Sequence, residues 1–162
     1  MTEDVVRRLG HLTLGSRLKR IGERLQADVT RLAEAEGLRV PAPLFPLITA
    51  LSRAGTMTVG EIAASLGVAQ PGVTRSLAQL ESLGLVKSVR NKADQRQRVV
   101  SLTARGADLV ARSSVDLWPR VEAAVAELCA GLSGPLLTQL DALEDRLAQL
   151  PLDRRAARHR AS

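Results

Sequence analysis

The sequence predicts a mainly α fold with one small β element. On both sides of the centre, apolar residues recur at intervals of three and four, the pattern of amphipathic helices. Two short central segments, 85–90 and 98–102, are instead rich in β-branched residues and bounded by polar ones, which favours strands. Phe45 and Trp118 are the only aromatic residues among 162, so the core must be aliphatic. The length is typical of one soluble domain of about 100–200 residues.

The N-terminal residues 4–36 predict one long helix that ends at Gly37. A helix of some thirty residues is about 45 Å long, more than a small domain needs to cover its own core. We therefore expect this helix to pack against another chain. Its apolar stripe comprises Val5, Leu9, Leu12, Leu18, Ile21, Leu25, Val29 and Leu32.

A proline-containing connector, residues 40–43, separates this helix from a shorter one. Residues 44–53 are nearly all apolar, which predicts a helix buried on most sides and closed by Gly55. Pro46 is tolerated near its start because the first turn lacks intrahelical N–H partners.

The next segment carries the signals of two helices joined by a tight turn. Thr58 and Glu61 have the spacing of a capping box, which starts a helix that Gly67 ends. Pro71 fits the first turn of a second helix that stops at Gly84. The buried side of this helix is predicted to comprise Val73, Leu77 and Leu80. The opposite face carries Arg75, Gln79 and Ser82, so the helix exposes long hydrogen-bonding side chains, as a recognition helix does.

The two strands and the turn between them form a basic hairpin. From residue 70 to residue 105 the chain holds seven basic residues against two acidic ones, a net charge of +5 where the whole chain has +6. Such a concentration of positive charge is the electrostatic footprint of a phosphate-binding surface. The segment 58–103 is therefore interpreted as a helix–turn–helix followed by a wing that binds duplex DNA.

These residues resemble the winged helix–turn–helix of the MarR family of bacterial regulators. The most specific features are the Asp-x-Arg of the wing and the Leu-Thr-x-x-Gly that follows it, here Asp94, Arg96, Leu102, Thr103 and Gly106. One departure is Ala69, where family members often have a serine, so the recognition helix lacks an N-cap side chain worth about 1 kcal/mol. The pattern of flanking helices extends the resemblance to roughly residues 5–150.

The resemblance implies a homodimer that binds a pseudo-palindromic operator in double-stranded DNA and acts as a ligand-released repressor. In the family the wing arginine enters the minor groove and the aspartate holds it, which assigns these roles to Arg96 and Asp94. A small aromatic or phenolic effector is expected between the dimer helices and the DNA-binding lobe, with His11 and Phe45 as its lining residues. The residues predicted to contact DNA are Gln70, Thr74, Arg75, Gln79, Arg90, Lys92, Asp94, Arg96 and Arg98.

After the wing, Thr103 is predicted to cap a second long helix that runs to about residue 130 and bends near Trp118 because of Pro119. Ser133 is predicted to cap a last helix with a leucine stripe from Leu136 to Leu150. The expected divisions are an N-terminal dimerisation helix (1–39), a winged helix–turn–helix lobe (40–105), C-terminal dimerisation helices (106–152) and a basic tail (153–162). That tail is read either as a solvated terminus or as an extra phosphate-binding arm.

Other functional classes find little support in the sequence. No membrane span or signal peptide is recognisable, so a cytoplasmic protein is expected. Cys129 is interpreted as a small buried residue, and no metal or cofactor is expected because His11 and His159 have no ligand spacing around them. Without a phosphate-binding Gly-rich loop or a catalytic set, an enzyme is disfavoured. The remaining alternative, a winged-helix module that binds another protein, predicts an apolar recognition face and a less basic wing.

Overall fold

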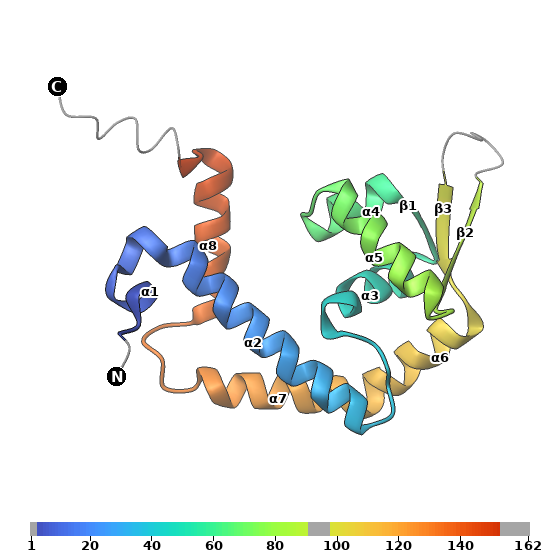
Figure 1. Ribbon diagram of the computed structural model, residues 1–162, viewed down its shortest axis with the longest axis horizontal. Helices are drawn as coiled ribbons and strands as arrows, with labels where there is room; N and C mark the ends of the chain where they lie inside the picture. Colours follow the sequence, from blue (N-terminus) through green and yellow to red (C-terminus); the bar gives the residue numbers. More distant parts are fainter. Residues whose placement is uncertain (1–2, 91–97, 153–162) are drawn as a thin grey trace. The chain divides into compact units, whose positions relative to one another are not determined.

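A computed structural model describes residues 3–90 and 98–152 of the chain. It divides into two compact units, the first reaching Val121 and the second starting at Glu122. Helices predominate, and one small antiparallel sheet lies beside them in the first unit, which confirms the predicted fold class (Figure 1). Within the described ranges, every helix falls short of the length and apolar character that crossing a membrane requires.

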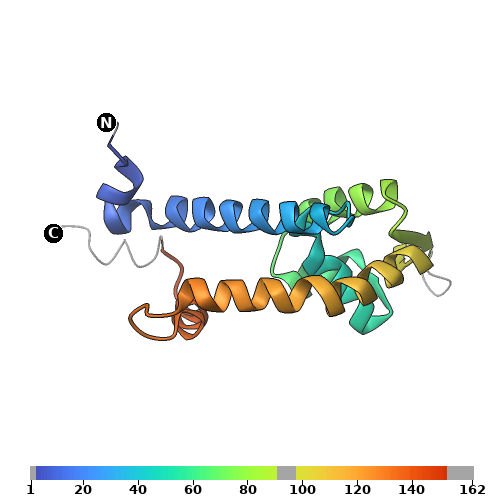
Figure 2. The ribbon, with the colours of Figure 1, turned by 90° about the horizontal axis from the view of Figure 1, so that it is seen from below.

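The N-terminal segment is broken where a single helix was predicted. It forms α1 (Val5–Arg8), a 3-10 turn η1 (Gly10–Thr13) and α2 (Leu14–Ala35). Gly10 takes a left-handed φ of 54°, which other residues rarely adopt and which ends the helical path. The Thr13 hydroxyl then donates to the Val6 carbonyl at 2.7 Å and fixes the turn. Figure 2 shows α1 folded away from the axis of α2.

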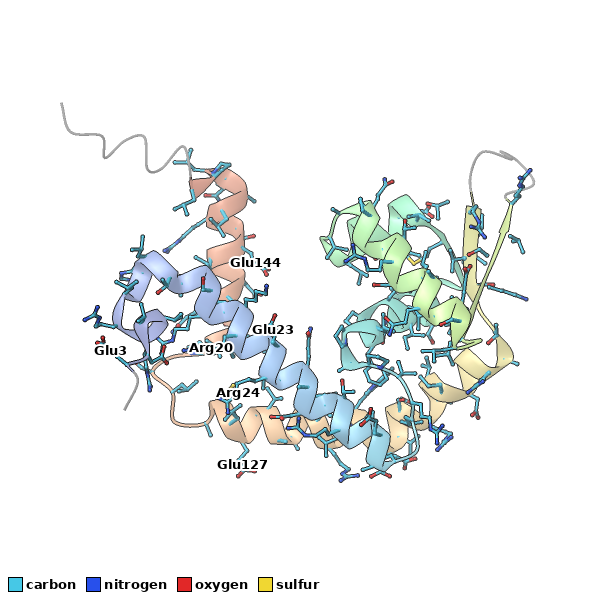
Figure 3. The ribbon with its side chains drawn as sticks, in the orientation of Figure 1. Glu3, Arg20, Glu23, Arg24, Glu127 and Glu144 are labelled. Carbon is cyan, nitrogen blue, oxygen red and sulfur yellow. The ribbon has the colours of Figure 1, made fainter. Side chains whose placement is uncertain are left out.

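An ion pair between Asp4 and Arg20 holds the start of α1 against α2. The carboxylate of Asp4 caps α1 by accepting from the Arg7 backbone N–H at 3.1 Å. It also accepts from the Arg20 guanidinium at 3.0 Å. The Arg20 hydrogen bond, with that from Arg7, lowers the pKa of Asp4 below its ordinary value. Figure 3 shows Arg20, Glu23 and Arg24 as charged residues of α2.

A buried helix forms the centre of the first unit. After the 3-10 turn η2 (Ala42–Leu44), α3 (Phe45–Ala54) buries one long side and ends at Gly55, whose φ is 78°. The Thr30 hydroxyl of α2 accepts from the Ala42 backbone N–H at 2.9 Å, which ties the connector to α2. The predicted short helix is confirmed, but burial on most sides is not, because Pro46 and the residues 52–54 are exposed. Its buried residues are Phe45, Leu47, Ile48 and Leu51.

The two helices of the helix–turn–helix are α4 (Val59–Leu66) and α5 (Gln70–Ser82). The predicted capping box starts α4: the Thr58 hydroxyl accepts from the Glu61 N–H at 3.2 Å, and the Glu61 carboxylate accepts from the Thr58 N–H at 2.7 Å. The Glu61 carboxylate also accepts from the Thr58 hydroxyl at 2.9 Å, and the bonds that it accepts from the Thr58 backbone N–H and hydroxyl lower the pKa of Glu61. Gly67 ends α4 with a φ of 63°, also as predicted.

The sheet has three strands rather than the two that were predicted. Strand β3 (Arg98–Leu102) lies between β1 (Thr56–Thr58) and β2 (Val86–Arg90), and both neighbours run antiparallel to it. The three residues of β1 are too few to give a strand pattern in the sequence, and they are ordered by pairing with β3. Val100, in the middle of the central strand, is completely buried.

The wing is attached to the following helix α6 (Ala104–Arg112) at one tightly packed point. As predicted, Thr103 caps α6 by accepting from the Gly106 N–H at 3.1 Å. The same hydroxyl donates to the Gly84 carbonyl at 2.7 Å, and the Thr103 N–H donates to the Leu85 carbonyl at 3.0 Å. Gly106 presses on Leu85 so closely that a Cβ at this position would overlap the Leu85 carbonyl oxygen.

The helical path beyond α6 continues through the position of Pro119. A π-helical turn η3 (Ser113–Leu117) joins α6 to α7 (Trp118–Cys129), and the Trp118 N–H bonds to the Ser113 carbonyl five residues back. This wider π-helical turn lies where Pro119, which has no backbone N–H, leaves one carbonyl without its usual hydrogen-bond donor. The last helix, α8 (Leu136–Gln149), begins after Pro135, so the prediction that Ser133 caps it is wrong.

The contact between Gly106 and Leu85 predicts a substitution that damages the fold. Gly106→Ala should lower the free energy of unfolding by about 1–3 kcal/mol, because the added methyl meets rigid backbone. Gly72→Ala is the matched control, since a Cβ there meets nothing within 4 Å and the residue lies in α5. Urea unfolding of both variants measures the difference. Equal stability of the two would show that α6 does not pack on Leu85 in this way.

Candidate nucleic-acid interface

Helix α5 has one buried side and one polar exposed side, as predicted. Val73, Leu77 and Leu80 are at most 5% exposed and anchor the helix in the core. Arg75 and Gln79 are exposed and project on the side away from these anchors. The exposed side therefore offers hydrogen-bonding groups at the spacing needed to reach base edges in a major groove.

The start of α5 differs from an ordinary helix start. Ala69 occupies the N-cap and makes no side-chain hydrogen bond, and Pro71 lies in the first turn. Gln70 and Thr74 are both exposed, and the Thr74 hydroxyl donates to the Gln70 carbonyl at 3.1 Å. The Gly72 and Val73 N–H groups donate to the Ala69 carbonyl at 3.0 and 3.4 Å, and Pro71 has no N–H, so this end of α5 presents mainly side-chain rather than backbone donors.

The ribbon of β2 and β3 carries a pair of arginines on the same side of the sheet as α5. Arg90 and Arg98 are direct cross-strand partners, so both side chains project from one face, which nearer the core carries the buried Val86 and Val100. Both arginines are exposed. Like charges directly opposite each other repel, and a bound phosphate would relieve that repulsion.

A network that the sequence did not predict connects α5 to both strands of the wing. The Glu81 carboxylate of α5 accepts from the Ser88 hydroxyl of β2 and lies 4.0 Å from the Arg98 guanidinium of β3. Glu81 therefore helps to set the orientation of Arg98 relative to the recognition helix. Spacing alone could not reveal this, because Ser88 and Arg98 come close to Glu81 only through strand pairing.

The wing tip itself, residues 91–97, lies outside the described residues. The predicted contacts Lys92, Asp94 and Arg96 fall in this segment and stay predictions. The structure places the six other predicted DNA contacts, Gln70, Thr74, Arg75, Gln79, Arg90 and Arg98, on α5 and on the adjoining ends of β2 and β3.

The two residues proposed for an effector site lie in different surroundings. Phe45 is buried and packs edge to face against Trp118, with the ring centroids 6.3 Å apart. Both rings line an open hollow of about 580 Å³ that also includes Met57, Leu66 and Arg53. His11 is exposed in η1 and is absent from the residues that line this hollow. Arg53 was not predicted, because its approach to the two aromatic rings depends on tertiary packing.

Groups of His, Cys, Asp or Glu suited to a metal ion do not occur among the residues that the structure describes. Cys129, interpreted as a buried thiol, is partly exposed and unpaired in α7.

Sequence comparisons agree with this arrangement. A model described as the MarR family matches residues 40–97. An uncharacterised HTH-type transcriptional regulator of Mycobacterium leprae is 34% identical over 106 residues, which make up 61% of this chain and 74% of that protein. The transcriptional activatory protein BadR of Rhodopseudomonas palustris is 34% identical over 93 residues, or 56% of this chain and 52% of BadR.

Solved structures show the same fold. The transcriptional repressor CouR, bound to a 23-mer DNA duplex, superposes on this chain with a TM-score of 0.63 at 27% identity. The superposition covers 88% of this chain and 96% of the CouR chain. A cysteine-to-serine mutant of MarR from E. coli, complexed with operator DNA, gives a TM-score of 0.69 at 21% identity. That superposition covers 90% of this chain and 99% of the MarR chain.

The family match and the relatives named as transcriptional regulators show that the chain is a DNA-binding transcription regulator, not an enzyme. The chain belongs to the MarR family.

Proposed function

We propose that the protein is a homodimer that binds a pseudo-palindromic operator and represses transcription until a small molecule releases it. The observation that carries the proposal is the shared face of α5, Arg90 and Arg98, which sets a polar recognition helix beside a positively charged ribbon. CouR, which is 27% identical, is a repressor bound to duplex DNA, and this supports the same mode of action here. Such a protein would work in the cytoplasm, where bacterial DNA lies.

In this proposal the two elements have different tasks. Arg75 and Gln79 read base edges in the major groove, since arginine pairs bidentately with guanine and glutamine with adenine. Gln70, Thr74, Arg90, Lys92 and Arg98 contact the phosphates that flank the groove. Arg96, held by Asp94, enters the adjacent minor groove, where a narrow A·T-rich groove concentrates negative potential.

The dimer is proposed to form through the long terminal helices. The described part of α8 buries none of its residues, although a leucine stripe runs along it. Apolar residues exposed to this extent mark an interface, because their burial against a second chain is favourable in free energy. In the first unit the exposed residues include Val5, Leu9, Leu12, Leu14, Leu18 and Ile21. In the second unit they include Leu128, Leu132, Leu136, Leu137 and Leu147.

The effector is proposed to occupy the hollow that Phe45 and Trp118 line. The two rings supply an apolar, edge-to-face surface on which an aromatic ligand can pack. Arg53 lines the same hollow and has the fork geometry that suits a carboxylate. An aromatic acid therefore fits the chemistry of this hollow better than a neutral phenol does. Because α3, β1 and α4 all contribute residues to it, a bound ligand would shift the population of lobe conformations that can bind DNA.

Substitutions should separate base reading from groove reading. Arg75→Ala should remove about 1–3 kcal/mol of discrimination between a selected operator and a scrambled duplex. Arg96→Ala should instead weaken binding to both duplexes. It should also reduce the slope of log affinity against log salt concentration by about 1, as the loss of one phosphate contact does. Asp94→Ala should have the same two effects, but smaller. Fluorescence anisotropy at several salt concentrations measures both quantities, with Arg24→Ala on α2 as the charge-matched control. Arg96→Ala with unchanged affinities and salt slope would contradict a DNA contact by the wing.

Removing the last helix should abolish the dimer. A chain that lacks residues 133–162 loses all of α8 and its leucine stripe, and should sediment as a monomer or become insoluble. The full-length chain, as the control, should sediment as a dimer. A soluble, monodisperse dimer of the truncated chain would place the interface elsewhere.

Aromatic acids should quench Trp118, the only tryptophan, and lower operator affinity. Benzoate and 4-hydroxybenzoate at millimolar concentration are the probes, and the corresponding benzamide tests the need for a carboxylate. Arg53→Gln should weaken the response to the acids about tenfold or more, because their carboxylate loses its partner. Unchanged tryptophan fluorescence and operator affinity with all probes would exclude this hollow as an aromatic-acid site.

A further inference from the structure

A second cleft of the first unit is lined by arginines and belongs to neither the DNA-reading face nor the aromatic hollow. Its volume is about 300 Å³. One wall is the connector from Gly37 to Val40, another is the end of α5 with the residues leading into β2, and the third is one face of α6. The residues of α6 that line it are Arg105, Asp108, Leu109 and Arg112, which share a helix face by their spacing.

The charge of this cleft is strongly unbalanced. Arg39, Arg105 and Arg112 line it together with a single carboxylate, Asp108. Arg112 donates to the Glu36 backbone carbonyl at 3.5 Å. Across the described ranges, none of the ion pairs includes Arg39 or Arg105. Three guanidinium groups around a concave space with one carboxylate leave an excess of positive charge, which creates a favourable position for an oxyanion.

The base of the cleft is apolar. Leu38, Val40, Leu85 and Leu109 are each less than 9% exposed and lie under the charged rim. The cleft therefore combines an apolar surface with bidentate hydrogen-bond donors, which is the usual composition of a small-molecule site.

We propose that this cleft binds a small molecule through a carboxylate or phosphate group and that its occupation alters DNA binding. A small ligand fits better than the backbone of a duplex because the site is concave and contains a carboxylate of its own. Asp108 would repel a continuous row of phosphates. In a small ligand it can accept a hydrogen bond from a hydroxyl or ammonium group beside the oxyanion.

The link to DNA binding rests on the proposed function and on where the cleft lies. Leu85 forms part of its lining and also accepts the Thr103 N–H at 3.0 Å. The neighbouring Gly84 carbonyl accepts the Thr103 hydroxyl at 2.7 Å. Three parts of the lobe thus meet at the cleft: the end of the recognition helix, the residue just before β2, and the cap of α6. A ligand that draws Arg39 towards Arg105 and Arg112 would move the support of α5 and the wing.

Binding is tested first without DNA. Inorganic phosphate and citrate are titrated into the full-length protein by calorimetry, at an ionic strength held constant with chloride. Both probes should bind the unmodified protein. For one or both of them, the affinity for Arg105→Gln and for Arg112→Gln should be tenfold or more below the affinity for the unmodified protein. Arg24→Gln on α2 removes the same charge outside the cleft and should leave the affinity unchanged. Asp108→Asn should bind the probes more tightly, because a repelling carboxylate is lost.

Two results of this titration would overturn the proposal. One is the absence of binding to the unmodified protein at millimolar probe concentration. The other is an equal loss of affinity in Arg24→Gln and the cleft variants, which would reveal a general charge effect. Neither result depends on whether an operator has been found.

The coupling is tested by operator anisotropy with and without the better-binding probe at constant ionic strength. A change in operator affinity that disappears in Arg105→Gln supports the coupling, and an unchanged affinity with the probe bound overturns it. If the probes do not bind but Arg105→Gln lowers the salt slope for DNA, the cleft contacts backbone phosphate and the small-molecule proposal is wrong. If the operator does not bind at all, the proposed function fails while the calorimetric result still stands.

Discussion

The packing of Gly106 against the Leu85 carbonyl is the constraint on which the DNA-binding surface depends. Because position 106 has no side chain, the first turn of α6 can lie directly on the backbone that leaves the recognition helix. Thr103 completes the joint by bonding to Gly84 and Leu85 while it caps α6. The Leu-Thr-x-x-Gly signature therefore has a structural reason in this chain. It fixes the exit of α5, the return of the wing and the start of α6 at one point.

This joint also explains how distant residues form one face. With the end of α5 and the start of β2 fixed, antiparallel pairing with β3 brings Arg98 opposite Arg90, and Glu81 reaches both Ser88 and Arg98. The recognition helix and the arginine pair of the ribbon therefore lie on the same side of the sheet. Two hollows adjoin the same framework, one beside the aromatic pair on α3 and α7 and one beside the joint itself.

Local signals allowed much of this to be predicted. The Thr58 and Glu61 capping box, the turn at Gly67 and the Thr103 cap each depend on residues within one helical turn, and all three are confirmed. The errors arose where the structure depends on distant contacts or on one special dihedral angle. Strand β1 exists only through β3, Gly10 breaks a pattern that its neighbours continue, and α8 starts at Leu136 although Ser133 has better capping chemistry. The Glu81 network and both hollows are tertiary features that sequence spacing cannot reveal.

The central claim is that α5 and the wing of two symmetric chains together read one duplex. Hydroxyl-radical footprinting on an operator selected from random duplexes tests it directly, because the cleavage pattern reports which sugars the protein covers on each strand. The footprint should have two-fold symmetry, half-sites about one helical turn apart (roughly 10 bp), and additional minor-groove protection on the outer flanks. A single asymmetric footprint, or protection without the flanking minor-groove signal, would contradict the claim.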